Sequence, residues 1–101
     1  MRIVVTGATG NVGTSLVAAL SRDSRIEEIV GIARRLPRLE LPRTSWIAAD
    51  VVDAPLIELF RGADAVVHLA WLIQPSRDES VTHAVNVDGS RRVFEAALWR
   101  P

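Results

Sequence analysis

The sequence predicts a doubly wound α/β domain with a parallel sheet of about four strands. Short apolar, β-branched runs alternate with helical patterns along the 101 residues, and a glycine-rich turn follows the first run. The composition, 49% apolar and 24% charged, is that of a single compact globular domain. Right-handed crossovers between the strands then give the expected order 3-2-1-4, with helices on both faces and a ligand crevice between strands one and four.

The first half of the chain should contain two strands and one helix. Residues Ile3–Thr6 lack polar alternation, as a strand covered on both faces does. From Asn11 to Arg22 the apolar residues fall at helical spacing, so one side of this helix should face the sheet. Ile29–Ala33 forms the second apolar run, and Arg34–Thr44, with two prolines, is expected to be a surface loop.

The second half should repeat this alternation. Trp46–Ala49 is the expected third strand, Ala54–Arg61 a helix, and Ala65–Ala70 the fourth strand. A final helix is expected from about Glu79 to Trp99, where Gly89 weakens the middle by roughly 1 kcal/mol relative to alanine. These elements complete one domain over residues 1–101.

The turn after the first strand has the spacing of a phosphate-binding motif. Gly7 permits a tight turn, Gly10 allows the backbone to approach a pyrophosphate, and Gly13 allows the helix to pack closely on the sheet. Backbone N–H groups at the helix start can then bind a diphosphate without a lysine. The alternative is that the glycines only connect a strand to a helix. The residues of this turn that we expect to bind the cofactor are Gly7, Thr9, Gly10, Asn11, Val12 and Gly13.

With these residues the chain resembles the extended short-chain dehydrogenase/reductases, also called NAD-dependent epimerase/dehydratases. Residues 6–13 match their TGxxGxxG turn, and residues 49–51 resemble the aspartate segment that reaches the adenine. Residues 67–70 look like the end of their fourth strand beside the cofactor, and residues 86–90 resemble their NVxGT segment. The resemblance covers nearly the whole chain and implies a Rossmann-type, NAD(P)-binding fold.

The residues after the second strand favour NADP over NAD. A dinucleotide fold commonly places an acidic residue about 20 positions past the glycines to bind the ribose 2′-hydroxyl. Here that position is Ala33, and Arg34 and Arg35 follow it. Both arginines could pair with a 2′-phosphate. The alternative is that they are simply solvated at the start of a loop.

Further cofactor contacts are expected where the third and fourth strands end. Asp50 could accept a hydrogen bond from the adenine amino group, and Val51 could contribute its backbone. Asp50 could equally cap the helix that follows, but Asp53 is better placed for that role. Trp71 could wall the nicotinamide side or simply pack. Asn86 lies within the last helix, where its low propensity hints at a hydrogen bond to the loop after the fourth strand. The remaining assignments are therefore Leu69, Ala70, Trp71 and Asn86.

No catalytic residue is assigned, because the chain contains no tyrosine, lysine or cysteine. In the family it resembles, a YxxxK motif exchanges a proton while hydride moves to or from the cofactor. His68 is expected to be a buried histidine with hydrogen-bond partners, His83 is expected to be solvated, and neither has the neighbours of a metal site. The simplest interpretation is the cofactor-binding half of a longer protein, ending before a fifth strand.

Three functional hypotheses follow. The first is the NAD(P)-binding portion of an epimerase/dehydratase or reductase whose hydride transfer belongs to the complete protein. The second is a non-catalytic, NADP-binding sensor or regulatory module. The third is a cofactor-free interaction domain, which predicts no response to NADPH or NADH.

Charge and hydropathy limit the partners. A net charge of zero and a pI near 6.7 argue against a nucleic-acid surface. The apolar runs are too short for a secretory signal or a membrane span, so a cytoplasmic protein is expected. The fourth strand would expose an apolar edge at Ala65–Leu69, so we expect a homo-oligomer formed through that edge or the last helix.

Overall fold

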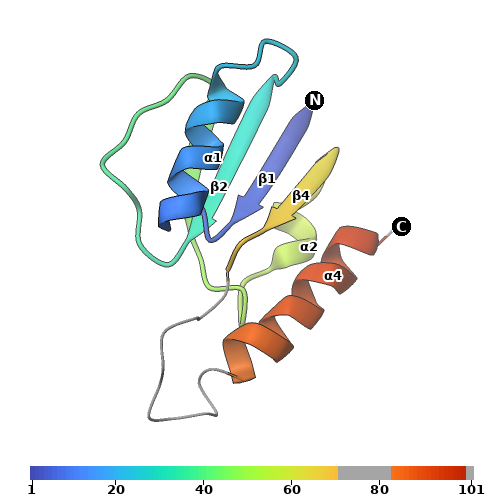
Figure 1. The fold of residues 1–101 in the computed structure, drawn as a ribbon. Helices are drawn as coiled ribbons and strands as arrows, with labels where there is room; N and C mark the ends of the chain where they lie inside the picture. The colour runs from blue at the N-terminus through green and yellow to red at the C-terminus, as the bar shows by residue number, and fades with distance from the viewer. Residues whose placement is uncertain (71–82, 100–101) are drawn as a thin grey trace.

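The computed structural model describes residues 1–70 and 83–99, which form a four-stranded parallel sheet flanked by helices (Figure 1). The strands pair in the order β3-β2-β1-β4, as the sequence predicts. The central strand β1 pairs on both sides, so that Val5 lies between Gly31 of β2 and Val67 of β4. The strands are β1 (Arg2–Thr6), β2 (Glu28–Ala33), β3 (Thr44–Ala48) and β4 (Ala65–His68).

Helices pack on both faces of this sheet. The described helices are α1 (Asn11–Ser21), α2 (Leu56–Leu59), a π-helical segment η1 (Ala84–Gly89) and α4 (Ser90–Leu98), which continues it. Successive residues of a strand face opposite sides, so Val4 packs toward α2 and α4 whereas Val5 packs toward α1. The doubly wound arrangement predicted from the sequence is therefore confirmed.

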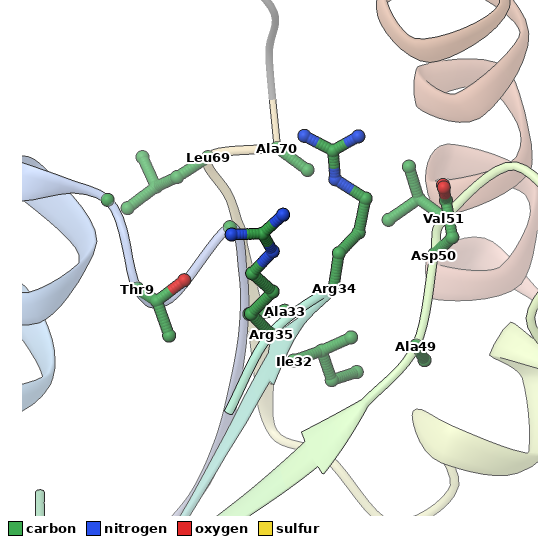
Figure 2. A pocket seen from close by; sticks show the side chains of 12 residues that line it. Thr9, Ile32, Ala33, Arg34, Arg35, Ala49, Asp50, Val51, Leu69 and Ala70 are labelled. Atoms are coloured by element: carbon green, nitrogen blue, oxygen red, sulfur yellow. The ribbon is translucent and has the colours of Figure 1, made fainter. Parts of the chain in front are cut away.

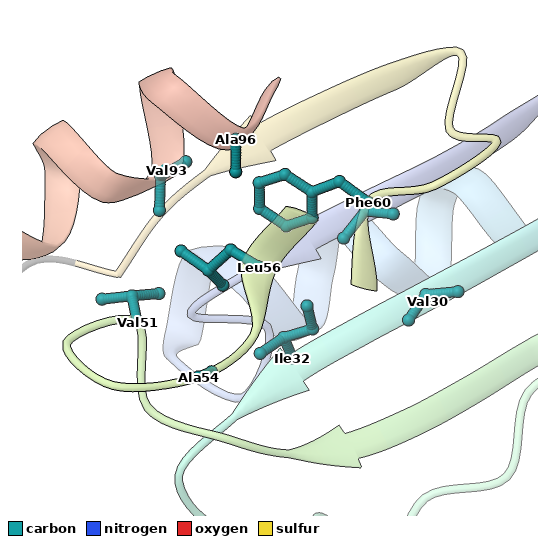
Figure 3. Packing of buried hydrophobic residues seen from close by; sticks show 9 residues of the cluster. Val30, Ile32, Val51, Ala54, Leu56, Phe60, Val93 and Ala96 are labelled. Atoms are coloured by element: carbon teal, nitrogen blue, oxygen red, sulfur yellow. The ribbon is translucent and has the colours of Figure 1, made fainter. Parts of the chain in front are cut away.

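The larger hydrophobic cluster lies between the sheet and the pair α2 and α4 (Figure 3). Phe60 and Leu56 occupy its centre, and Val93 and Ala96 of α4 close it from above. Fully burying an aliphatic or phenyl side chain contributes about 1.5–3 kcal/mol, so this cluster fixes α4 beside the strand ends. It contains Val4, Val30, Ile32, Val51, Ala54, Leu56, Phe60, Val93 and Ala96.

Two predicted elements are shorter in the structure. The helix expected over 54–61 is the four-residue α2, whose N-cap is Pro55; no side chain caps it, so the prediction that Asp53 does so is wrong. The strand expected over 65–70 ends at His68, and its last ladder hydrogen bond runs from the N–H of Leu69 to the carbonyl of Thr6, 3.0 Å away. The pairing stops there because β1 itself ends at Thr6, before the turn at Gly7.

The third strand begins and ends earlier than the range 46–49 predicted from its apolar run. It occupies one edge of the sheet, where the indole of Trp46 packs over Gly31; a Cβ at that glycine would lie 2.5 Å from the ring. The predicted last helix is described from residue 83 onward. Its π-helical segment ends at Gly89, the position expected to weaken it.

Arg2 joins several segments at the amino ends of the strands. Its backbone N–H donates to Asp64 Oδ2 at 2.7 Å, and its Nε donates to Glu28 Oε2 at 3.0 Å. The same guanidinium also donates to the carbonyl of Arg61. These contacts secure the end of the sheet that lies opposite the predicted ligand crevice.

Candidate cofactor-binding site

A cavity of about 530 Å³ opens at the carboxyl ends of the strands, where the sheet order reverses (Figure 2). It brings together nine of the residues assigned from sequence, which come from four separate segments. Three further residues, Ile32, Ala33 and Ala49, were not assigned, although strand ends beside a crevice are the places to expect them. The nine are Gly7, Thr9, Gly10, Arg34, Arg35, Asp50, Val51, Leu69 and Ala70.

The three glycines of the turn meet different constraints. Gly7 has a φ of +67°, and a Cβ there would lie 2.5 Å from the carbonyl carbon of Leu69. A Cβ on Gly13 would overlap the backbone of Gly7 and Ala8, so glycine is needed for α1 to pack against the turn. A Cβ on Gly10 would meet only the carbonyl oxygen of Gly7, at 3.7 Å. Gly10 therefore leaves open space on the side of the cavity.

The amino end of α1 can bind an anion through its backbone. Gly10 is the N-cap residue, no side chain caps the helix, and no acidic residue lies in its first turn. The first helical hydrogen bond runs from the N–H of Thr14 to the carbonyl of Gly10, at 2.8 Å. The N–H groups of Asn11, Val12 and Gly13 consequently have no acceptor within the helix, and they carry its partial positive charge. A pyrophosphate fits this donor set.

The two arginines predicted to select the cofactor stand in the mouth of the cavity. β2 ends at the buried Ala33, so Arg34 and Arg35 begin the following loop, and both are exposed. Figure 2 shows their guanidinium groups between Thr9 on one side and Asp50 with Val51 on the other. This places positive charge beside the end of β2, where a ribose 2′-substituent would be expected.

The segment after β3 is shaped by hydrogen bonds. Asp50 Oδ1 accepts the N–H of Val52 at 3.0 Å, and the carbonyl of Asp50 accepts the N–H of Ala54 at 2.8 Å. From α4, Arg92 donates to the carbonyl of Val51 and, at 2.7 Å, to that of Ala54. Arg92 carries no recognisable signal in the sequence, because the contact joins residues 41 positions apart.

His68 is held between two hydroxyl groups. Its Nδ1 lies 2.6 Å from Thr6 Oγ1, and its Nε2 lies 2.8 Å from Ser90 Oγ. Burial lowers the pKa of His68 below its ordinary value of 6.5. The predicted hydrogen-bond partners of His68 are confirmed, but the side chain is half-buried and not fully buried as expected. His83 is exposed and lies 3.6 Å from Asp88.

The sequence model of the NAD dependent epimerase/dehydratase family matches residues 3–100, nearly the whole chain. The chain belongs to this family. The resemblance seen in the motifs is thereby confirmed, and the glycine turn, the arginines and the segment after β3 are parts of an epimerase/dehydratase fold.

Three relatives illustrate the similarity. Over 97 residues the chain is 41% identical to an uncharacterized protein of Mycobacterium tuberculosis, a match covering 95% of this chain and 10% of that protein. It is 40% identical over 98 residues to L-arabinose 1-dehydrogenase (NAD(P)(+)) of Haloferax volcanii, covering 96% of this chain and 36% of the enzyme. The structure of UDP-glucuronic acid 4-epimerase from Bacillus cereus in complex with NAD aligns with a TM-score of 0.81 at 27% identity, covering 95% of this chain and 35% of that one. The chain thus spans little more than a third of these relatives at most.

Of the other assigned residues, Asn11, Val12 and Gly13 begin α1 and do not line the cavity. Asn86 is buried beside a second groove, which His68 and Phe94 also line. Trp71 lies outside the described residues. None of the helices within residues 1–70 and 83–99 has both the length and the apolar character that crossing a bilayer requires.

Proposed function

We propose that this chain binds a nicotinamide dinucleotide in the cavity at the carboxyl ends of its strands. In this role it is the cofactor-binding portion of an epimerase/dehydratase or reductase, and hydride transfer belongs to the complete protein. The observation that carries the proposal is the open space beside Gly10, where α1 presents uncapped N–H groups to the cavity. Two of the relatives, by their names, use or hold NAD or NAD(P).

Different residues would contact different parts of the cofactor. Gly7, Thr9 and Gly10, with the N–H groups that begin α1, would hold the diphosphate. Asp50 and Val51 would face the adenine, and the segment at Leu69–Ala70 would lie beside the nicotinamide side, with Trp71 and Asn86 as further proposed contacts. A bound nicotinamide supplies a hydride donor or acceptor; the chain's part is binding and orientation.

We further propose that NADP binds more tightly than NAD. Arg34 and Arg35 offer planar donor groups at the end of β2, where Ala33 provides no acceptor for a ribose hydroxyl. Asp50 lines the same cavity, but it is engaged with the N–H of Val52.

Titration with NADPH and NADH, followed by cofactor fluorescence, tests both proposals. The wild-type chain should bind NADPH more tightly than NADH. Replacing Arg34 and Arg35 together by alanine should cost about tenfold or more in NADPH affinity, because charge-assisted hydrogen bonds are lost, and should leave NADH affinity nearly unchanged.

Arg38→Ala is the matched control, because Arg38 is exposed on the same loop and does not line the cavity. Undiminished preference for NADPH in the double variant would refute the role of the arginines. Failure of the wild-type chain to bind either nucleotide would favour the cofactor-free interaction domain.

The absence of tyrosine and lysine leaves a non-catalytic sensor as the second candidate. Such a module would bind NADPH and change its association with a partner without turnover. Coding sequence that continues past Pro101 into a YxxxK segment would support the enzyme, and a stop codon at that point would favour the sensor. The cytoplasmic location predicted from the sequence stays a prediction.

We also propose that the isolated chain forms a homo-oligomer through the β4 edge or α4. Within the described sheet, β4 pairs with β1 alone. On α4, Phe94 and Leu98 are 57% and 77% exposed, which is unusual for large apolar side chains on one helix. Both features favour association with a second copy.

A further inference from the structure

His68 lies where three elements meet beside the cavity. It is the last residue of β4, and its two ring nitrogens reach Thr6 on β1 and Ser90 on α4. Thr6 directly precedes Gly7 of the glycine turn, and Leu69, which follows His68, lines the cavity. The imidazole thus joins the segments on which the glycine turn rests to the helix behind them.

The hydrogen bonds around His68 assign its tautomer. The N–H of Leu69 donates to Thr6 Oγ1 at 3.2 Å, and the side chain of Thr6 is fully buried. The hydroxyl hydrogen of Thr6 therefore goes to the acceptor within reach, His68 Nδ1. An accepting Nδ1 puts the ring hydrogen on Nε2, which donates to Ser90 Oγ. All the hydrogen bonds then run in one direction from Leu69 to Ser90, and they require a neutral ring.

We propose that His68 is a positioning residue for the cofactor cavity, in which the neutral ring with its hydrogen on Nε2 holds the carboxyl ends of β1 and β4 against α4. The inference rests on the proposed function. The turn is sensitive to such positioning because Gly7 packs directly on the backbone that follows His68: even a Cβ would lie 2.5 Å from the carbonyl carbon of Leu69. A shift of the β4 end therefore moves the glycine turn.

Protonation would break this arrangement. A second ring N–H, on Nδ1, would face the hydroxyl hydrogen of Thr6, which is donated to no other group among the described residues. Among those residues, the charged side chains that line the same groove are Arg91 and Glu95 of α4, which have opposite signs, and β1 contributes the uncharged Thr6. Burial lowers the pKa of His68, so the ring is neutral at ordinary pH and charges only on acidification.

The test is the affinity for NADH from about pH 8 down through the pH at which NMR shows His68 to titrate, which burial places below the ordinary histidine pKa of 6.5. NADH is the probe because it lacks the 2′-phosphate, which itself titrates in this range. Wild-type affinity should fall about tenfold on acidification, the change expected when one hydrogen bond is lost. His68→Gln, whose amide can still donate toward Ser90 but does not titrate, should show little pH dependence.

Two variants complete the design. Ser90→Ala removes the partner on α4 and should weaken NADH binding at about pH 8 by several-fold, as a lost hydrogen bond does. His83→Gln is the matched control, because His83 is the other of the chain's two histidines and is exposed; it should behave like wild type.

Nitrogen NMR of the wild-type imidazoles covers the case in which a variant fails to fold. The proposal expects hydrogen on Nε2 of His68 and amide shifts of Gly7 and Leu69 that follow the titration of His68. A ring with hydrogen on Nδ1, or NADH affinity that is constant with pH or follows His83, would overturn it. If the wild-type chain binds neither NADH nor NADPH at about pH 8, both the proposed function and the role of His68 are refuted. Binding that does not depend on pH refutes the role of His68 alone.

Discussion

Gly10 and Gly13 belong to one turn, yet the structure gives them opposite consequences for substitution. A methyl group on Gly13 would overlap the backbone of Gly7 and Ala8, whereas a methyl group on Gly10 would meet only one oxygen at ordinary contact distance. Gly13 is therefore required for packing, whereas Gly10 is required only when a ligand is present. Folding and binding can therefore be separated within four residues.

Gly10→Ala should change the free energy of unfolding by no more than about 1 kcal/mol, the usual scale of an N-cap substitution. It should weaken NADPH and NADH alike by about tenfold or more, because the methyl group occupies the approach of the pyrophosphate. Gly10→Val should abolish binding. Urea denaturation and cofactor fluorescence measure the two effects.

Gly13→Ala is the comparison, and it should destabilise the fold by about 1–3 kcal/mol through overpacking. Equal losses of stability in the two alanine variants would contradict the division of roles.

The sequence was sufficient to predict that the glycine turn and the two arginines lie beside one cavity, because each is a local pattern beside a strand end. Ser90 and Arg92 could not be predicted in this way. Their partners, His68 and the carbonyls of Val51 and Ala54, come close only after α4 packs on the sheet. Trp71 remains untested, since it lies outside the described residues.

At the scale of elements, α4 shapes the cavity without lining it. Arg92 joins α4 to the segment after β3 through two backbone carbonyls, and the same segment presents Asp50 to the cavity. The guanidinium fork matches two carbonyls at once, which an ammonium group would not do. Packing of α4 thereby fixes the loop between β3 and α2.

Arg92→Met keeps the aliphatic stem and removes the donors. It should lower the free energy of unfolding by about 1–3 kcal/mol, because the carbonyls of Val51 and Ala54 lose their partner on α4. The dinucleotide affinity should fall as well. Arg91→Met, one position earlier and exposed, is the control in urea denaturation; similar losses for both would show that Arg92 has no special role.

The turn between α1 and β2 responds to acid. Hydrogen bonds from the side chain and backbone of Arg25 lower the pKa of Asp23 from 3.8 to about 2. A lowered folded-state pKa means that this contribution to stability is complete above about pH 4 and is lost as the pH falls toward 2. A carboxyl titration by carbon NMR should show the low pKa in the wild type and its return toward 3.8 in Arg25→Ala.

At the scale of the whole molecule, the strand order follows from the alternation of strands and helices joined by right-handed crossovers, so it could be predicted from the sequence. The lengths of α2 and β4 were not predictable in this way, because α2 begins only after Pro55 and ends before Phe60, and β4 stops pairing where its partner β1 ends, at Thr6. The predicted oligomer also belongs to this scale.

Sedimentation equilibrium should show self-association of the isolated chain that Leu98→Glu weakens, since the charge would be buried against a second copy. Leu36→Glu, an equally large change at an exposed site on the loop after β2, is the control. A monomer at high concentration would exclude both proposed surfaces.

The contacts of Arg2 with Glu28 and Asp64 lie at the opposite margin of the sheet from Arg34. A five-residue strand separates the two margins by about 17 Å, which exceeds the Debye length at physiological ionic strength. Substitutions of Arg2, Glu28 or Asp64 can therefore change the thermal stability of the fold, while the electrostatic potential at the nucleotide site stays the same.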